Sequence, residues 1–519
     1  MKRIGKSAVV LLAVSLLLGL LAACSGNGGN AGNGNNGTDG AGTANGGTGA
    51  NAGNDGAAAG SGELATIKIV QPGSEPTEAK KRWDAVNAKL KADGAGVQVE
   101  FQYIGWDAWE QKTNLMLSTN EPFDDLTIME DLIKTSVYVG RGALQPIDAY
   151  LAKYPDLKNK FTDEVWNGIK VNGKIYGIPV INREWANDYE LISYRSDLFA
   201  KYNLPVPTTF QGFIDAADQI KKAEKDQNLF VVMKPNFLAG ALHREYGTYP
   251  FNVIDDLIYV DQSGNVKSWM ETDEFKQDWS YFHQMYQKGL IHPDILTLPL
   301  DQVTKPIVDG EFIFDLGNGF FDYPTIKQKK PEVEMDAVRL APEKQWMRPI
   351  VATNANVIPK TSKNPEAVIK FYNWLYSSQD NYDLLVYGIK DDWWKDAGPN
   401  KREALRPVGN EVQFSEWTMG YGPFTRIATN AHPKLFDTLQ LSDKAVNAAN
   451  VGFTFDTTPV SVEYANLLAE IKTSVYPLKM GVADWDDFYP GALKKMKAAG
   501  LDKVVAEYKK QFDAWKASK

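Results

Sequence analysis

Alternating apolar and polar positions mark two strands near the start of the globular part of the chain, with a helical pattern between them. Residues 65–70 and residues 97–103 alternate with the period of two that is typical of a half-buried strand. Between them, apolar residues recur at helical spacing in a segment that Thr77 can cap and Gly94 can end. Those apolar residues are Trp83, Val86 and Leu90. The pattern therefore predicts a strand, a helix and a second strand.

A second helix and a third strand follow in the same order. The pattern predicts a helix over residues 107–118 and a strand over residues 125–129. Strands and helices that alternate with short connections are typical of a parallel α/β sheet. Such a sheet holds ligands beyond the carboxyl ends of its strands, so we expect a site in the loops after Val70, Met129 and Val180.

Helical patterns recur through the rest of the chain. Thr209 can cap a helix, Pro365 can open another at its first position, and Gly500 separates the last two. The apolar face after Thr209 consists of Phe210, Phe213, Ile214, Ala217 and Ile220, and that of the last helix consists of Val504, Val505, Tyr508, Phe512 and Trp515. Residues 63–519 exceed the length that one core normally organises, so we expect two domains.

The N-terminus has the three parts of a secretory signal peptide. Residues 1–6 are basic, residues 8–21 are almost entirely apolar but too short to span a bilayer, and small residues follow. Leu21–Cys24 (Leu-Ala-Ala-Cys) resembles the bacterial lipobox, in which the cysteine is acylated and becomes the first mature residue. A plain signal peptide with an incidental cysteine is the alternative. Because Cys24 is the only cysteine in the chain, we expect a signal peptide over residues 1–23 and a lipid, such as palmitate, on Cys24.

Residues 24–62 are expected to form a flexible tether. After Cys24 they contain only Gly, Asn, Ala, Ser, Thr and two Asp, so they have no apolar surface whose burial would offset the entropy of ordering. A segment of this composition has an r.m.s. reach of roughly 35 Å. A globular body on such a tether beside a membrane is well placed to capture solutes.

Charge and rare residues narrow the range of partners. The formal net charge of −9 argues against nucleic acid and against adhesion to anionic lipid, which leaves acyl chains as the membrane contact. One cysteine excludes an intramolecular disulfide and a CxxC zinc site, and the four histidines are scattered. Residues 261–265 resemble part of a calcium loop but lack its later glycine and glutamate, so we expect a hairpin turn there. We expect no metal and no cofactor, although a calcium ion at an unrecognised site stays open.

Short fragments over most of the chain agree in order and spacing with one protein family. The fragments are Phe123–Leu126, Gly142–Ile147, Asn172–Pro179, Tyr194–Leu198, Pro207–Phe210, Asp309–Glu311, Asn364–Ala367, Phe371–Leu375, Lys497–Lys503 and Gln511–Trp515. Together they resemble the family 1 extracellular solute-binding proteins of ABC importers, in particular the Gram-positive lipoprotein branch that handles oligosaccharides.

The resemblance implies an α/β, two-lobed periplasmic-binding-protein-like fold of type II. The ligand would lie in the cleft between the lobes, and three crossover segments would join them: one soon after Ile178–Val180, one near Pro349–Ile350 and one around Gly388. The implied N-terminal lobe comprises residues 63–185 plus about 350–390, and the C-terminal lobe comprises residues 186–349 plus about 391–519. Hinge closure around the ligand is the motion that the family implies.

Aromatic and polar residues near the expected cleft are the candidate ligand contacts. A sugar has an apolar face and a rim of hydroxyl groups, which flat aromatic rings and polar side chains can bind. The aromatic candidates are Trp185, Phe320, Phe321, Trp393, Trp394 and Trp417, and the polar candidates are Ser74, Glu75, Glu130, Asp131, Asn187, Asp188 and Asn318. Most of the 14 tryptophans are assigned to the core, and any single acidic candidate is equally well interpreted as a solvated loop carboxylate.

These inferences predict a monomeric protein, lipid-anchored on the outer face of the cell membrane. It would capture a small solute, in the first place an oligosaccharide, and deliver it to the permease subunits of an ABC importer. A binding protein that reports to a membrane receptor, a ligand other than a sugar, and a secreted glycoside hydrolase are the alternatives; the two carboxylates of a hydrolase need no sequence motif. We expect no enzyme activity, because no nucleophile elbow or Ser-His-Asp pattern is present and the family fragments belong to binding proteins.

Overall fold

The computed structural model describes residues 64–129, 134–181, 190–226, 228–233, 240–316, 319–350, 352, 354–406, 414, 416–435 and 444–519. All of them belong to one unit, Gly62–Lys519. The expected signal peptide, Cys24 and the tether lie outside these residues. No helix in the described ranges is both long and apolar enough to cross a membrane.

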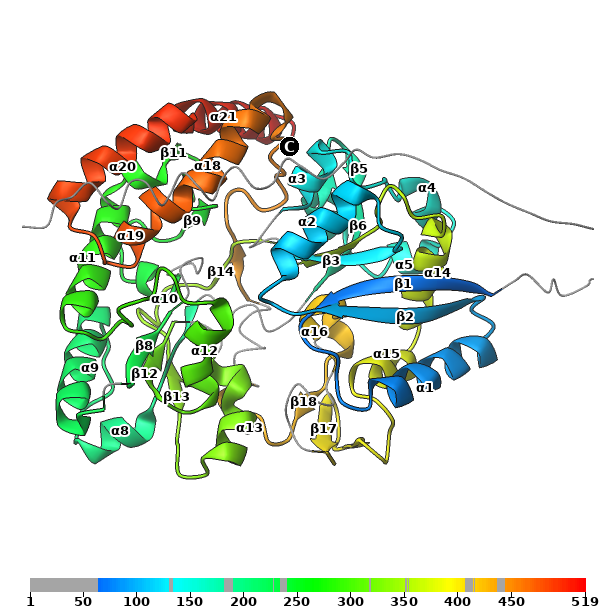
Figure 1. Cartoon of the computed structure of the whole chain (residues 1–519), viewed down its shortest axis with the longest axis horizontal. Helices are drawn as coiled ribbons and strands as arrows, with labels where there is room; N and C mark the ends of the chain where they lie inside the picture. Colours follow the sequence, from blue (N-terminus) through cyan, green and yellow to red (C-terminus); the bar gives the residue numbers. More distant parts are fainter. Residues whose placement is uncertain are drawn as a thin grey trace, which may run out of the picture. The chain divides into compact units, whose positions relative to one another are not determined.

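A five-stranded sheet in the order β2-β1-β3-β15-β6 forms the centre of the first lobe (Figure 1). Its strands are β1 (Ala65–Pro72), β2 (Val97–Ile104), β3 (Asp125–Met129), β6 (Gly177–Val180) and β15 (Asn354–Val357). β1 pairs in parallel with β2 and β3, whereas β15 runs antiparallel to β3 and β6. The three predicted strands and their parallel pairing are confirmed. β15, from a distant part of the sequence, lies between β3 and β6.

The helices that connect these strands bury the residues that their spacing predicted. α1 (Ala79–Ala92) buries its three predicted apolar residues, and α2 (Trp109–Thr119) lies where a helix was expected. The predicted cap is wrong, because Thr77 does not precede the helix directly. Glu78 does, with a left-handed φ of 58° and no side-chain hydrogen bond to the helix.

A four-stranded sheet in the order β13-β7-β12-β8 forms the centre of the second lobe. Its strands are β7 (Ile192–Tyr194), β8 (Phe230–Val232), β12 (Phe312–Asp315) and β13 (Asp336–Val338). A large apolar core surrounds this sheet and contains no residue of the first sheet's strands. The two sheets therefore belong to two separately packed lobes, in agreement with the expected two-lobed α/β fold.

The predicted helix starts are confirmed at two places. α9 (Phe210–Glu224) begins after Thr209, whose hydroxyl accepts a hydrogen bond from the backbone N–H of Gly212, and the predicted apolar face is buried. α14 (Pro365–Leu375) has its proline at the first helical position. Both starts follow from local rules that act within one turn of the helix.

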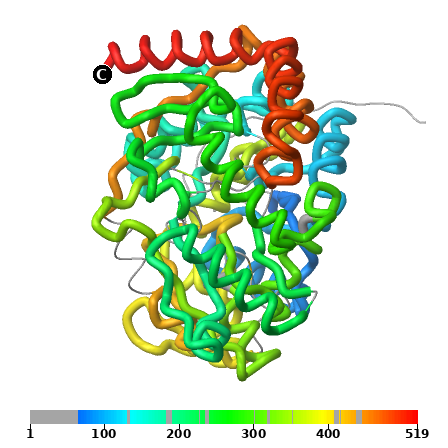
Figure 2. The backbone as a smooth tube through the Cα atoms, turned by 90° about the vertical axis from the view of Figure 1, so that its left-hand side faces the viewer, coloured from blue at the N-terminus to red at the C-terminus, as the bar shows by residue number. Residues whose placement is uncertain are grey.

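The C-terminal helices are also confirmed. α20 (Trp485–Ala499) ends at Gly500, which has a φ of 112°, and α21 (Leu501–Ala517) buries Tyr508 and Phe512. α21, red in Figure 2, runs across one end of that view directly above a green hairpin that includes β11 (Val266–Ser268).

The expected hairpin turn at residues 261–265 is present. β10 (Ile258–Asp261) pairs antiparallel with β11, and the Asn265 backbone N–H and side-chain amide donate to the two oxygens of Asp261. Both carboxylate oxygens of Asp261 are thus engaged within the turn.

The remaining described elements range from two-residue strands to the long helices α11 and α18. They are α3 (Thr135–Gly140), α4 (Asp148–Leu151), α5 (Pro155–Lys158), α6 (Asp163–Gly168), β4 (Lys170–Val171), β5 (Lys174–Ile175), α8 (Ser196–Lys201), α10 (Gly240–His243), β9 (Phe251–Ile254), η1 (Trp269–Glu271), α11 (Asp273–Gln287), α12 (Leu300–Val308), α13 (Gly319–Lys329), β14 (Met347–Arg348), α15 (Gln379–Val386), β16 (Trp394–Asp396), β17 (Lys401–Ala404), α16 (Glu416–Met419), η2 (Gly422–Phe424), β18 (Ile427–Ala428), β19 (Val446–Asn447), η3 (Thr458–Val460), α18 (Ser461–Ser474) and α19 (Tyr476–Lys479).

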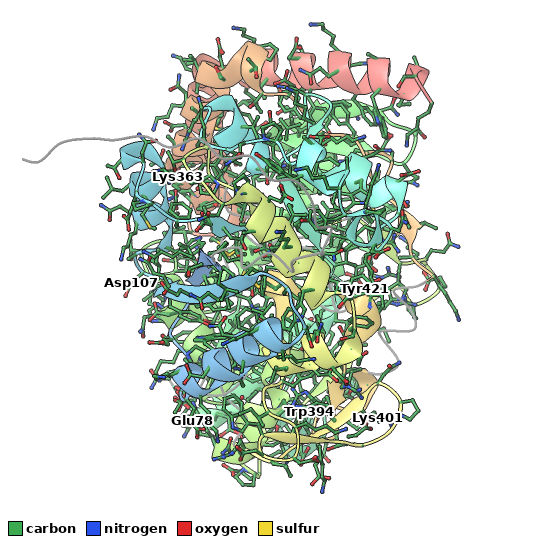
Figure 3. The ribbon with its side chains drawn as sticks, turned by 90° about the vertical axis from the view of Figure 1, so that its right-hand side faces the viewer. Glu78, Asp107, Lys363, Trp394, Lys401 and Tyr421 are labelled. Atoms are coloured by element: carbon green, nitrogen blue, oxygen red, sulfur yellow. The ribbon has the colours of Figure 1, made fainter. Side chains whose placement is uncertain are left out.

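The chain passes between the lobes at two of the three expected places, after β6 and between β13 and β15. The third expectation, a passage around Gly388, is wrong. Gly388 has a φ of 84° and lies directly against the Trp393 ring, where any Cβ would clash, so the chain turns back onto the first lobe there. The segment through β18 stays with that lobe, beside α1 and α15, as the positions of Trp394 and Lys401 in Figure 3 illustrate. Residues 391–428 therefore do not belong to the C-terminal lobe as expected.

Asp125, at the start of β3, is a buried carboxyl group in the first lobe. Its side chain is fully buried, one oxygen accepts a hydrogen bond of 2.6 Å from the Tyr372 hydroxyl, and the other has no partner among the described residues. Burial raises the pKa of Asp125 to about 7. In the unfolded chain the pKa is near 3.8, so at pH values above 7 folding must place a negative charge in the core.

We predict that the protein loses stability as the pH rises from about 4 to about 7 and that Asp125→Asn removes much of this loss. The shift in pKa corresponds to up to about 4 kcal/mol, because one pKa unit is about 1.36 kcal/mol. Urea unfolding of both proteins at several pH values measures the difference. Asp84→Asn, which removes an exposed carboxylate paired with Lys80, is the control and should leave the pH dependence unchanged. Parallel pH profiles for wild type and Asp125→Asn would contradict the prediction.

Candidate functional site

The carboxyl ends of β1, β3 and β6 lie at one edge of the first sheet, together with the amino end of the antiparallel β15. Ser74 and Glu75 follow β1 at this edge, and both are exposed. With Gly73, Tyr103 and Gly105 they line an open depression. Two predicted polar contacts thus lie where an α/β sheet presents its ligand-binding loops.

Two tryptophans from distant parts of the sequence meet beside this depression. Trp106 follows β2 and is 40% exposed, and its ring lies 5.6 Å from that of Trp417, at 31°. Gly73 brings the loop after β1 against Trp106, since a Cβ there would lie 3.6 Å from the Trp106 Nε1. Trp417 was predicted and Trp106 was missed. The sequence did contain a signal for Trp106, because it follows the end of a predicted strand, as Ser74 and Glu75 do.

Trp417 is held in place by the short helix α16. The last three carbonyl groups of α16 each accept a side-chain hydrogen bond from the first lobe. Asn354 Nδ2 donates to Trp417 at 2.7 Å, Asn356 Nδ2 donates to Thr418 at 2.7 Å, and the Tyr376 hydroxyl donates to Met419 at 3.1 Å. A helix of four residues has almost no stability of its own, so these bonds are needed to fix the carboxyl end of α16, which carries Trp417.

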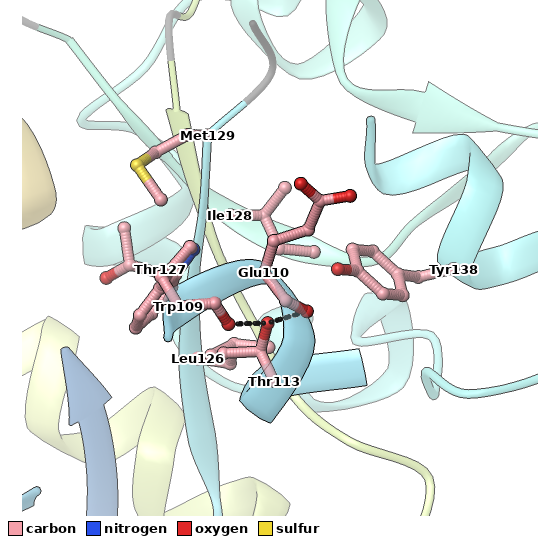
Figure 4. Close-up of a pocket in the computed structure, with 8 residues that line it drawn as sticks. All are labelled: Trp109, Glu110, Thr113, Leu126, Thr127, Ile128, Met129 and Tyr138. Carbon is pink, nitrogen blue, oxygen red and sulfur yellow. Dashed lines mark hydrogen bonds between the residues drawn. The ribbon is translucent and has the colours of Figure 1, made fainter. Parts of the chain in front are cut away.

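A second, smaller pocket lies between α2, β3 and α3 (Figure 4). Its lining residues are Trp109, Glu110, Thr113, Leu126, Thr127, Ile128, Met129 and Tyr138. The Thr113 hydroxyl donates to the carbonyls of Trp109 and Glu110 at 2.7 and 3.3 Å. The pocket holds only about one water molecule, so it is too small for a sugar.

Several predicted contacts lie outside the described residues. They are Glu130, Asp131, Trp185, Asn187, Asp188 and Asn318. Phe320 and Phe321 belong to the first turn of α13, but their side chains are also outside the described set. These assignments therefore stay predictions.

Trp393 and Trp394 are described, and both lie in the core of the first lobe. They are 3% and 2% exposed. Trp394 Nε1 donates to the carbonyl of Gly388 at 3.0 Å, and the Arg82 guanidinium lies 4.9 Å from the Trp393 ring. Because neither ring has a free face on which a sugar could stack, we do not retain them as ligand contacts.

The described part of the chain contains no candidate metal-binding site. Within those ranges, no three His, Cys, Asp or Glu side chains come together in a way that could hold a metal ion.

Comparison with known proteins places these observations in a family. The sequence model of the bacterial extracellular solute-binding proteins matches residues 73–382, and that of a domain of unknown function matches residues 449–517. A carbohydrate ABC transporter substrate-binding protein of Streptococcus pneumoniae is 24% identical over 478 residues, which cover 89% of this chain and 93% of that protein. Lipoprotein LipO of Bacillus subtilis is 21% identical over 394 residues, which cover 73% of this chain and 72% of LipO.

A solved structure has the same fold. The N-glycan transport solute-binding protein NgtS of Streptococcus pneumoniae, in complex with Man5GlcNAc, superposes with a TM-score of 0.70 at 21% identity. The match covers 88% of this chain and 99% of NgtS. Since the family model spans more than half of the chain, including the loop that carries Ser74 and Glu75, this protein belongs to the bacterial extracellular solute-binding protein family.

Proposed function

We propose that this protein binds an oligosaccharide outside the cell and delivers it to an ABC importer. The observation that carries the proposal is the pair of indoles, Trp106 and Trp417, at the ligand-binding edge of the first sheet. Aromatic rings stack on the apolar faces of sugars, and neighbouring carboxylate and hydroxyl groups bind the hydroxyl rim. Ser74 and Glu75 supply such groups beside the indoles. The carbohydrate importer protein of Streptococcus pneumoniae and the N-glycan complex of NgtS support a sugar as the ligand.

The remaining predicted contacts complete the proposed site. Trp185, Asn187 and Asp188 belong to the first passage between the lobes, Glu130 and Asp131 follow β3, and Asn318, Phe320 and Phe321 precede or begin α13. Their positions at strand ends and at a crossover support contacts from both lobes to a ligand in the cleft between them.

The proposed role is transport without catalysis. The family and its relatives are binding proteins, and the aromatic pair offers a surface for stacking rather than a reacting group. We further propose that the protein works as a monomer, anchored to the outer face of the membrane through a lipid on Cys24 and the tether of residues 24–62. The description of the relative LipO as a lipoprotein supports the anchor.

Removing either indole should weaken sugar binding. We predict that Trp106→Ala and Trp417→Ala each weaken binding by about 1–3 kcal/mol, the range for losing an aromatic anchor. A thermal-shift screen against an oligosaccharide panel that includes Man5GlcNAc identifies the ligand, because ligand at a hundred times its Kd stabilises by about 2.7 kcal/mol. Calorimetry on the variants then measures affinity. Trp515→Ala, which truncates a half-buried tryptophan on α21, is the control and should bind like wild type. Wild-type affinity in both site variants would overturn the assignment.

Ligand binding should also close the lobes. A ligand shifts a conformational equilibrium only if it binds one state better, and contacts from both lobes favour the closed state. We predict that the ligand found in the screen reduces the radius of gyration of residues 63–519 in small-angle scattering. A saturating ligand that leaves the curve unchanged would place the site outside the cleft, and consumption of the sugar would favour the hydrolase.

The anchor depends on one thiol. We predict that Cys24→Ser leaves the body folded and abolishes lipid attachment, because the chain has no other cysteine. Labelling of cells with a radioactive fatty acid measures attachment, and circular dichroism of the released protein measures folding. Incorporation of label into the serine variant would show that the lipid is elsewhere.

A further inference from the structure

We propose that Glu416 is a positioning residue of the ligand site, which fixes the amino end of α16 and thereby the direction in which Trp417 faces Trp106. The proposal deepens the proposed function and rests on it only for the effect on sugar affinity. Its geometric part concerns the unliganded protein and can be tested without a sugar.

The Glu416 carboxylate is the hub of a hydrogen-bond network with helix α15. The hydroxyls of Tyr382 and Tyr387 both donate to Oε1 of Glu416, at 2.7 and 2.8 Å. Tyr382 lies within α15, Tyr387 directly follows its last residue, and both are buried. Burial raises the pKa of the Glu416 carboxyl, while the two phenol hydrogen bonds lower it.

The phenol oxygens extend the network to the residues that follow α16. The Tyr382 oxygen accepts a hydrogen bond of 3.2 Å from the backbone N–H of Tyr421, and the Tyr387 oxygen accepts one of 2.7 Å from that of Arg426. The two hydroxyls thus hold the segment from Glu416 to Arg426 at three places: the Glu416 carboxylate, the Tyr421 N–H and the Arg426 N–H. In such a network each hydroxyl must keep its orientation to serve both partners, which restricts the segment more than isolated bonds would.

Both ends of α16 are therefore fixed, but by different parts of the lobe. Asn354, Asn356 and Tyr376 hold its last carbonyls, as described above, and Glu416 holds its first residue against α15. Gly420 permits the tight turn that follows, because a Cβ there would lie 2.3 Å from the Glu416 carbonyl oxygen. With only the carboxyl end held, the helix could pivot and carry the Trp417 indole away from Trp106.

The same segment contacts the first passage between the lobes. The backbone N–H of Ile181 donates to Gly420 at 3.2 Å, and that of Gly422 donates to Ile181 at 2.8 Å. Ile181 is the last described residue before the chain continues to the second lobe. The position of α16 is thus linked to the start of a crossover, so Glu416 also aligns the stacking surface with the segment that must bend when the lobes close.

The test uses fluorine NMR of the full protein labelled with 5-fluorotryptophan, with the Trp417 and Trp106 signals assigned by Trp→Phe variants. Tyr382→Phe with Tyr387→Phe removes both hydroxyls that bind Glu416 while leaving the sequence around Trp417 intact. We expect the Trp417 signal of this double variant to move or broaden beyond its linewidth in the absence of sugar. Glu416→Gln keeps an oxygen that accepts both hydroxyls, so its Trp417 signal should stay close to that of the wild type.

The matched control is Tyr372→Phe, which removes a buried phenol hydroxyl of the same lobe that donates to Asp125 and not to the α16 segment. It should lower the melting temperature and leave the Trp417 signal in place. If the double variant does not fold, each single variant should move the signal in the same direction. An unmoved Trp417 signal in the tyrosine variants, or an equal movement in Tyr372→Phe, would overturn the proposal.

Sugar affinity is the second measurement. For the oligosaccharide that stabilises the wild type in the thermal-shift panel, we expect the double variant to bind about tenfold more weakly and Glu416→Gln to bind within about twofold of wild type. If the signals move as expected but the wild type binds no sugar in the panel, the positioning role stands and the proposed sugar function fails. Moved signals with unchanged affinity would overturn the claim that Glu416 serves the ligand site.

Discussion

A chain of buried hydrogen bonds across the first sheet is the constraint on which the candidate site depends. The Gln71 side-chain amide on β1 donates to the Thr127 hydroxyl on β3 at 2.9 Å, and that hydroxyl donates to Asn356 on β15 at 2.7 Å. Asn356 in turn donates to the Thr418 carbonyl of α16. A buried polar group left without a partner costs about 1–3 kcal/mol, so these four segments must keep one register relative to each other. The stacking surface is positioned by that register.

A comparable constraint acts in the second lobe, where two passages enter and leave it. The fully buried Arg244 pairs with Glu190 at 2.5 Å and donates to the carbonyls of Leu340 and Ala341 on the returning segment. Glu190 lies two residues before the start of β7, and its carboxylate also accepts a hydrogen bond of 3.0 Å from the backbone N–H of Met347. One ion pair thus ties the end of the outgoing passage to the start of the returning one. Removing one partner would leave a buried charge unpaired, which is strongly destabilising.

These two networks suit a protein whose lobes move relative to each other. Each lobe has its own core, and buried polar bonds fix the segments that lie next to the passages, so the proposed closure would bend the passages rather than the lobes. Ser74 and Glu75 at the ligand-binding edge are exposed. A binding site that couples ligand binding to closure of the lobes needs exposed side chains on a rigid support.

Local patterns in the sequence determined much of this protein's fold. The strands over residues 65–70, 97–103 and 125–129, the cap at Thr209 and the stop at Gly500 depend on residues within one or two turns, and all are confirmed. The place of Ser74 and Glu75 directly after β1 could be predicted for the same reason, since a strand end is a local feature. Family resemblance added the two-lobed arrangement, which no local pattern contains.

Long-range packing decided the rest. The pairing of Trp106 with Trp417 depends on α16, whose four residues are held by side chains from β15, from α15 and from the residue that follows α14. Trp393 and Trp394 lie in a polar stretch of sequence, which favours exposure. The turn at Gly388 nevertheless places both in the core of the first lobe. For the same reason the chain does not leave the first lobe around Gly388, where a passage was expected. Which of several tryptophans faces solvent is a property of contacts between segments far apart in the chain, and such contacts leave no periodic trace in the sequence.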